Sequence, residues 1–497
     1  MQNDEEKLNI ENKDINNSSN LDEPKKVIKN IFIVVFGNIC TILAGVLVGF
    51  LIPKIMQNGD STIDYGFYKI YTLYFGYIGL FHFGFCDGIL LMFAGKKYED
   101  LEKEKIRCYT KFFIIFQFII SLFILIPSIF YINTEYGFIF LFIGINLFSG
   151  NITEYYQQIC QATGRFKELS LRNIIKALLN SIIIMVLFIL WKISVIDYLK
   201  FQIYIYCVTF VGWAITIWYI FNHRDITFGK SIKIKDALPM IKKFYIIGIP
   251  LLISNFVSNF ILNIDRQFVS ILFPTETYAT YAFAYNMLQL ITTATGAISL
   301  VLFPTLKRFS EDKLKNHYNY FISIVIMFVG LCLISYFPLY VIVIHWLEGY
   351  SSSLPIFQII LPGLILSSTI NMIMFNYYKA LGKSTIYFIN SLIILLLSIA
   401  ADFVAYFVFK TTLSISIASV IVMVLWYFIT DIYLVKKWKI NTIKNFIYIA
   451  LIITSFLLST YLISNIYLSG VIYLICYIII SFIFYFKLIK NKFKFSE

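Results

Sequence analysis

The sequence predicts an all-α protein that crosses a membrane many times, and three observations support this prediction. Hydrophobic residues make up 59% of the 497 residues and charged residues only 14%, which is typical of polytopic membrane proteins. The apolar residues fall in runs of about 20 or more, the length an α-helix needs to cross the bilayer hydrocarbon. Lysine and arginine are concentrated in alternate segments between these runs, as in proteins whose loops alternate between two compartments.

The length criterion predicts about fourteen membrane-spanning helices. They lie near residues 27–52, 67–92, 110–131, 137–159, 172–190, 199–221, 245–272, 278–303, 318–343, 355–378, 386–409, 412–435, 443–465 and 468–486. Residues 1–24 precede them and are polar and rich in asparagine. We expect this segment to be disordered.

The positive charge indicates the orientation of the chain and not a nucleic-acid partner. The net charge is +13, and basic clusters occur in segments that share one side if the N-terminus is cytoplasmic. These clusters include Lys96 and Lys97, Lys242 and Lys243, and Lys436 and Lys437. We therefore expect a multi-pass protein of the bacterial cytoplasmic (inner) membrane with both termini in the cytoplasm.

Two short matches indicate that the chain is an internal duplication. Gly164-Arg165 follows the fourth predicted span, and Gly382-Lys383 follows the tenth. Pro53 ends the first span and Pro274 ends the seventh, and both matches have an offset of about 220 residues. Parallel repeats of this kind are one known plan of transporters, with the substrate at the interface of the halves. We predict an N-terminal lobe of six helices (25–222), a cytoplasmic linker (223–243), a C-terminal lobe of six helices (244–437) and two additional helices with a basic tail (438–497).

The sequence offers no sign of an enzyme. No nucleotide-binding loop, nucleophile elbow, zinc-protease motif or pair of carboxylates at a useful spacing occurs. The predicted outer loops are short, whereas a polymerase or ligase needs a large loop to hold its catalytic groups. The seven cysteines lie singly, without a CxxC or His-Cys spacing, so no metal site is indicated. Transport is the class that remains.

A polar stripe in the seventh span is the first candidate site. At about 100° per residue, Asn255, Asn259, Asn263, Arg266 and Ser270 fall on one face of a helix within 244–273. A row of hydrogen-bonding groups does not face lipid, so we expect it to line a polar seam or a water-filled cavity. The alternative is that Arg266 extends to the membrane surface or pairs with the adjacent Asp265.

Other spans carry polar faces of the same kind. Asn286 and Gln289 lie on one face of the eighth span, and Lys69 and Asp87 share a face of the second, with His82 beside it. A snorkelled or paired charge is the alternative for Lys69 and Asp87, and a satisfied buried histidine is the alternative for His82.

Acidic residues inside spans are candidates for ion coupling. Glu154 lies in the fourth span, while its counterpart in the tenth span is Met372. A desolvated acid in a transporter helix is suited to carry a proton or a sodium ion. We place Glu154, Asp87, Asp265 and His82 in this group, and Asp402 has the same ambiguity. Acids that hydrogen-bond to neighbours near the interface are the alternative.

These residues resemble a known family. The Asp265-Arg266 pair, the Gly164-Arg165 and Gly382-Lys383 turns and the duplicated halves are similar to the polysaccharide branch of the multidrug/oligosaccharidyl-lipid/polysaccharide (MOP) exporter superfamily. The stretch Leu47–Tyr98, which contains DYGFYKIYTLYFGYIGLFHFGFCDGI, resembles bacterial O-antigen and capsule repeat-unit flippases.

The resemblance implies a V-shaped bundle, like that of the multidrug (MATE) exporters, with a central cavity that opens alternately to either side. The implied substrate is an oligosaccharide on undecaprenyl pyrophosphate, destined for lipopolysaccharide O-antigen or capsule. Cations such as Arg266 and Lys69 would bind the pyrophosphate. The sugars would contact amides, hydroxyls and rings, namely Asn255, Asn259, Asn263, Asn286, Gln289 and Tyr285.

The resemblance also implies that no cofactor is needed, because a proton or sodium gradient drives transport, and that polysaccharide polymerase or assembly proteins are partners. Fourteen spans exceed the twelve common among repeat-unit flippases and match lipid II flippases. A lipid II flippase and a cation-coupled drug exporter therefore remain alternatives, and a polymerase or ligase is a third.

Overall fold

The computed structural model describes residues 41, 43–307 and 309–492, and every element in these residues is a helix or a short helical turn. A single β-bridge between Asn58 and Ser61 closes a loop. The predicted polar segment 1–24 and the first half of the predicted span 27–52 lie outside the described residues.

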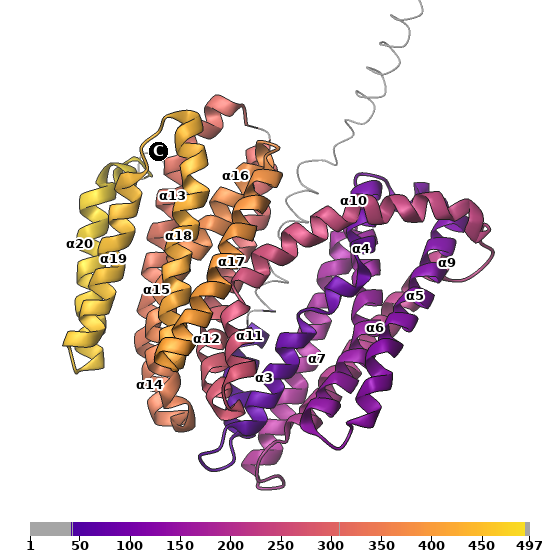
Figure 1. Ribbon diagram of the computed structural model, residues 1–497, viewed down its shortest axis with the longest axis horizontal. Helices are drawn as coiled ribbons and strands as arrows, with labels where there is room; N and C mark the ends of the chain where they lie inside the picture. Colours follow the sequence, from indigo (N-terminus) through magenta and orange to yellow (C-terminus); the bar gives the residue numbers. More distant parts are fainter. Residues whose placement is uncertain (1–40, 42, 308, 493–497) are drawn as a thin grey trace, which may run out of the picture.

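The first half of the chain forms one lobe, shown in indigo to purple in Figure 1. Its helices pack largely around α6, with close pairs α5–α6, α6–α8 and α3–α6. The elements are Leu43–Met56, α3 (Ile63–Phe75), a 3-10 turn (Ile78–His82), α4 (Phe85–Phe93), α5 (Lys103–Phe130), α6 (Glu135–Ala162), α7 (Phe166–Lys192), α8 (Phe201–Asn222) and α9 (Arg224–Thr227).

The second half forms the other lobe, and the last two helices pack on its far side, away from the first lobe (Figure 1). The elements are α10 (Ile234–Ile261), α11 (Ile264–Leu272), α12 (Thr275–Lys307), α13 (Glu311–Cys332), α14 (Tyr336–Trp346), α15 (Leu354–Thr369), a π-helical turn (Ile370–Met374), α16 (Phe375–Ala380), α17 (Ser384–Phe409), α18 (Thr412–Trp438), α19 (Ile443–Leu462) and α20 (Ile466–Lys492).

The described residues contain 11 helices that are long and apolar enough to cross a membrane, or up to 12 if the bent pair Ile63–His82 and Phe85–Phe93 is one span. The all-α membrane architecture is therefore confirmed. The number fourteen is not, since the first predicted span is only partly described and α12 is not among these candidates.

The two glycine turns behind the predicted repeat have the same geometry. Gly164 has φ 72° and Gly382 has φ 67°, the left-handed conformation that glycine adopts most readily. The amide of Arg165 donates to Cys160 O, and that of Lys383 donates to Tyr378 O, both at 2.8 Å. Equivalent helices in the two lobes thus end with equivalent hydrogen bonds.

The second predicted span is broken, contrary to the prediction of one continuous helix over 67–92. The chain bends by 59° between His82 and Phe85, where Phe83 and Gly84 have φ of 50° and 78°. A Cβ at Gly84 would lie 2.4 Å from the amide nitrogen of Ile249, so α10 approaches this break backbone to backbone. Because of the break, the predicted common helix face of Lys69 and Asp87 is wrong.

The two lobes meet at one end of the molecule, which we call the sealed end. It carries the loops around residues 57–62 and 347–353, and α3 and α12 converge there (Figure 1). Tyr350 Oη donates to Pro53 O at 3.1 Å, and Ser61 Oγ donates to Glu276 Oε1 at 2.7 Å. A Cβ at Gly66 would lie 2.5 Å from Thr275 O.

The opposite end, which we call the basic end, carries the glycine turns and the lysine-rich loops. There α10 extends from the second lobe across to the first (Figure 1) and packs on α4. A Cβ at Gly88 would lie 2.1 Å from Phe244 O, so only glycine permits this approach. The lobes are therefore connected at both ends, with a cavity between them.

Candidate functional site

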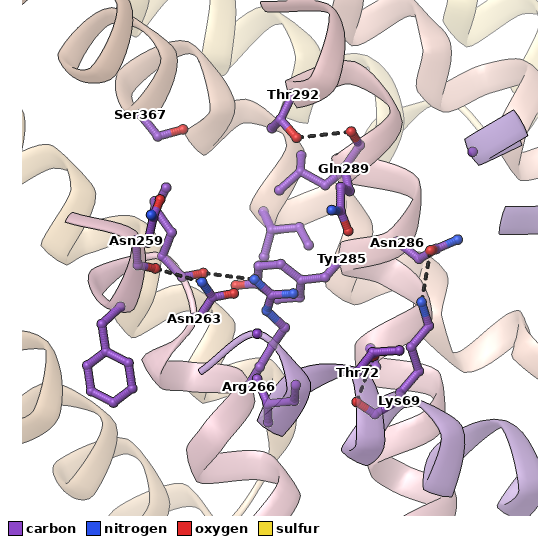
Figure 2. A pocket seen from close by; sticks show the side chains of 18 of the residues that line it. Lys69, Thr72, Asn259, Asn263, Arg266, Tyr285, Asn286, Gln289, Thr292 and Ser367 are labelled. Atoms are coloured by element: carbon purple, nitrogen blue, oxygen red, sulfur yellow. Dashed lines mark hydrogen bonds between the residues drawn. The ribbon is translucent and has the colours of Figure 1, made fainter. Parts of the chain in front are cut away.

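A cavity of about 790 Å³ lies between the lobes and brings together most of the predicted site residues. Its wall comes from the helix Leu43–Met56, α3, α10, α11, α12, α15 and α18. The predicted residues that line it are Lys69, Asn259, Asn263, Arg266, Tyr285, Asn286 and Gln289 (Figure 2). Asn255 is exposed and does not line it.

A second helix break places the polar stripe of the seventh span in this wall. α10 ends at Ile261 and α11 begins at Ile264, with Asn263 at its N-cap. The side-chain amide of Asn263 donates to Asn259 O at 2.6 Å, which holds these two residues together. The predicted continuous helix is thus two helices, yet Asn259, Asn263 and Arg266 still face the same space.

The guanidinium group of Arg266 has few interactions of its own. Its Nη2 donates to Leu262 O over a long 3.4 Å, and its Nε is buried without a hydrogen-bond partner. The group lies 4.8 Å from the centre of the Tyr285 ring, which is within cation–π distance. No ion pair to Arg266 occurs in the described part of the chain.

The carboxylate of the neighbouring Asp265 is hydrogen-bonded to other groups, and it forms no ion pair with Arg266. The Asp265 carboxylate is 2% exposed. Its Oδ2 accepts from Tyr281 Oη at 2.8 Å, from Tyr285 Oη and from Ser419 Oγ at 3.3 Å. Its Oδ1 accepts from the backbone amide of Arg266 at 2.7 Å. The adjacent side chains of Asp265 and Arg266 therefore have different hydrogen-bond partners.

Lys69, the second cation of the cavity, has a neutral partner. Its Nζ donates to Asn286 Oδ1 at 2.9 Å (Figure 2), and Asn286 Nδ2 donates to Gly49 O at 3.1 Å. The ammonium group also lies 5.2 Å and 5.5 Å from the ring centres of Tyr65 and Tyr68. Lys69 has no carboxylate partner within ion-pair distance among the described residues.

The cavity is thus cationic, and its walls suit a polar, ring-containing molecule. Lys69 and Arg266 line it, and no aspartate or glutamate occurs among the described residues of its wall. Charges removed from water are costly unless an opposite charge compensates them. Aromatic residues (Tyr68, Tyr77, Phe256, Phe260, Tyr278 and Tyr285) form further parts of the wall. The arrangement favours an anion over a cation.

The other predicted ion-coupling residues lie inside the first lobe and not in the cavity. His82 Nδ1 accepts from the amide of Gly84 at 3.1 Å, and its Nε2 lies 3.9 Å from Asp87 Oδ2. Asp87 Oδ2 is buried without a hydrogen-bond partner, whereas Glu154 Oε1 accepts from Gln158. The structure brings His82 and Asp87 together at the break of the second span.

The second lobe contains an acid that the sequence marked only weakly. Asp402 in α17 is 0% exposed, and both its carboxylate oxygens are buried without hydrogen-bond partners. Its helix, α17, packs against α11, which carries Asp265. The only sequence signal for this residue was a single acid in a long apolar run.

Sequence reasoning missed a charged cluster at the basic end. Glu168 pairs with Arg165 at 2.7 Å and with Arg172, and His223 Nε2 lies 3.5 Å from Glu168 Oε1. Cys160 Sγ lies 3.6 Å from the same His223 nitrogen. Burial lowers the pKa of His223 more than the carboxylate of Glu168 raises it. The helical i, i+4 spacing of Glu168 and Arg172 was the available signal.

Comparison with known proteins identifies the family. A family model described as "Polysaccharide biosynthesis protein" matches residues 27–311, more than half of the 497-residue chain. The chain belongs to the polysaccharide biosynthesis protein family. No curated protein sequence matches it.

Solved structures show that this family member has the fold of MOP-superfamily transporters. It is similar to "Lipid II flippase MurJ, inward closed conformation", with a TM-score of 0.68 and 17% identity over 93% of this chain and 100% of the other. It is also similar to an inward-facing MATE-family multidrug transporter of the MOP superfamily, with a TM-score of 0.59 and 13% identity over 81% and 94%. At these identities the likeness establishes the fold and not the substrate.

Proposed function

We propose that this polysaccharide biosynthesis protein is a flippase that moves oligosaccharides linked to undecaprenyl pyrophosphate across the bacterial cytoplasmic membrane. The proposal includes the predicted orientation, in which the basic end faces the cytoplasm because lysine and arginine are retained on that side. The lobes would expose the cavity to each side in turn. The product would enter the assembly of O-antigen or capsule.

The observation that supports this proposal is the positive charge of the cavity wall, which no acidic residue among the described residues of that wall balances. Lys69 and Arg266 face the same space, and neither forms an ion pair within the described residues. A pyrophosphate group supplies the missing negative charge and several acceptor oxygens. The amides of Asn259, Asn263 and Gln289 and the aromatic walls are suited to sugars.

The same charge argues against a drug exporter for lipophilic cations, which would need an acid in the wall. Asp265 is the nearest candidate, but three hydroxyl groups satisfy its Oδ2. A lipid II flippase carries the same pyrophosphate chemistry and remains the second candidate. The two substrates share the pyrophosphate lipid and differ in the group attached to it, which in lipid II includes a peptide.

We also propose that a proton or sodium gradient drives transport through the pair Asp265 and Asp402. A buried carboxylate favours the uptake of a proton or another cation, because its charge is costly away from water. Asp402 has the unsatisfied oxygens that such a site requires. Asp87 and Glu154 in the first lobe are the alternative carriers.

The first test is mass spectrometry of polyprenyl-linked lipids from cells in which the gene is depleted. Accumulation of one undecaprenyl-pyrophosphate oligosaccharide is expected, and its mass would identify the sugars. Accumulated lipid II would assign the protein to cell-wall export, and an unchanged lipid pool would contradict both flippase functions.

The second test uses variants in the depleted cells. Arg266→Ala is expected to abolish export while the protein still reaches the membrane, because the anion loses its main unpaired cation. Asn255→Ala is the matched control, since this asparagine belongs to the same stripe but lies outside the cavity wall. Normal export by Arg266→Ala would contradict the anion-binding role.

A further inference from the structure

The two cations of the cavity, Arg266 and Lys69, differ in their hydrogen bonds. Arg266 has only a long hydrogen bond to its own helix and an unpartnered Nε. Lys69 is held by Asn286 across the lobe interface. We propose that the Lys69–Asn286 hydrogen bond is a latch that an anion in the cavity releases, so that substrate binding unlocks the sealed end. This inference rests on the proposed function.

The latch joins the two lobes through three elements. Lys69 belongs to α3 of the first lobe and Asn286 to α12 of the second. Asn286 also donates to Gly49 O, on the helix Leu43–Met56 of the first lobe. One asparagine side chain thus accepts from one helix of the opposite lobe and donates to another, which fixes the position of α12 against both.

The latch lies between the cavity and the contacts of the sealed end. One turn before Lys69 along α3, the ring of Tyr65 packs edge-on against Phe283 and Tyr350 of the second lobe. Tyr278 of α12 donates to Lys69 O at 3.4 Å, and Gly66 is in close contact with Thr275. A movement of α3 away from α12 would therefore separate the whole sealed end.

An anion competes directly for the group that closes the latch. Lys69 Nζ points into the cavity that Arg266 also faces (Figure 2). A hydrogen bond from an ammonium group to a phosphate oxygen is stronger than one to an amide oxygen, because both partners are charged. Arg266 has few interactions to give up, so it would bind the pyrophosphate first and present it to Lys69.

The release explains why an empty cavity stays sealed. With no anion present, Asn286 is the best acceptor for Lys69, and the lobes remain joined. With an anion present, Asn286 loses its hydrogen bond from Lys69, and the closed state loses the stabilisation that this bond provides. The ligand thereby shifts a population between two states, as it must if its affinity for them differs.

The test measures the distance across the sealed end by electron paramagnetic resonance in nanodiscs. Spin labels at Asp60 and Glu348, exposed residues on the two lobes, report the closed and open populations in a variant whose native cysteines are replaced. Undecaprenyl pyrophosphate is the probe, and neutral undecaprenol is its control. Binding of each lipid is measured separately by native mass spectrometry.

Lys69→Met is expected to raise the ratio of open to closed protein about tenfold without any lipid, the effect of losing one hydrogen bond to a charged group. Asn286→Ala should give at least this shift, because it also removes the hydrogen bond to Gly49 O, and the double variant should open no further than Asn286→Ala alone. Undecaprenyl pyrophosphate should open the wild type and have little further effect on Asn286→Ala. Asn255→Ala, an asparagine outside the interface, should behave like the wild type.

The outcomes separate the latch from the proposed function. If Asn286→Ala and Lys69→Met leave the populations unchanged, or if their effects add fully, the latch does not exist, even when the pyrophosphate lipid binds. If wild type does not bind that lipid, the proposed substrate fails instead. Opening by undecaprenol equal to that by the pyrophosphate lipid would contradict release by an anion.

Discussion

Two arginines inside the helical bundle have different surroundings. Arg172, at the basic end, is 1% exposed, pairs with Glu168 and lies 3.7 Å from the centre of the Tyr219 ring. Arg266, in the central cavity, has a long hydrogen bond to a backbone carbonyl and no acid within ion-pair distance among the described residues. Arg172 belongs to the long helix α7, and Arg266 belongs to the short helix α11.

The difference distinguishes a charge that stabilises the fold from a charge that is available to bind a ligand. Removing a paired buried ion leaves its partner uncompensated, so Arg172 is expected to matter for stability. Arg266 has no ion-pair partner among the described residues, so it is suited to bind an anionic ligand. Three measurements test this distinction.

The largest expected effect concerns stability at the basic end. Arg172→Ala should lower the free energy of unfolding by about 1–3 kcal/mol, because Glu168 loses its buried partner and keeps only the more exposed Arg165 and the contact with His223. Thermal unfolding of the purified protein measures this. Arg266→Ala is the matched control and should change stability by less than about 1 kcal/mol, since it removes an unsatisfied group. Equal losses for the two variants would refute the distinction between the arginines.

A second prediction applies the same reasoning to the acids. Asp402→Asn should remove the dependence of transport on the cation gradient, because the carboxylate without hydrogen-bond partners is lost. Glu154→Gln should retain that dependence, since Glu154 is already held by Gln158. Transport into inverted vesicles with imposed proton or sodium gradients distinguishes them. Loss of coupling in Glu154→Gln alone would move the coupling site to the first lobe.

The smallest effect is the pH dependence contributed by His223, which is 0% exposed. Burial holds the pKa of His223 below its usual value of about 6.5. The unfolded chain therefore binds the proton more readily, and this contribution to stability is lost as the pH falls below about 6.5. His223→Gln should flatten the decrease in thermal stability between about pH 7 and 5. If His223→Gln leaves the pH dependence of thermal stability unchanged, groups other than His223 cause that dependence.

The sequence predicted the all-α membrane class, because this class depends on local properties, whereas the duplicated halves stay a prediction. Apolar length determines which segments can cross a bilayer. The Gly164 and Gly382 turns were recognisable because a left-handed helix end favours glycine wherever it occurs. The polar stripe was recognisable because helical periodicity places Asn259, Asn263 and Arg266 on one side, and a short break after Ile261 left them there.

Which charged side chains have ion-pair or hydrogen-bond partners depends on the tertiary structure. The break at Phe83 and Gly84 separates Lys69 from Asp87, and it depends on the close approach of α10 to Gly84. Lys69 and Asn286 also meet across helices that are far apart in the chain, and so do Glu168 and His223. Periodicity gives the face on which a side chain lies. Whether that side chain meets an acid, an amide or an open cavity depends on the packing of distant helices, and no local pattern encodes that packing.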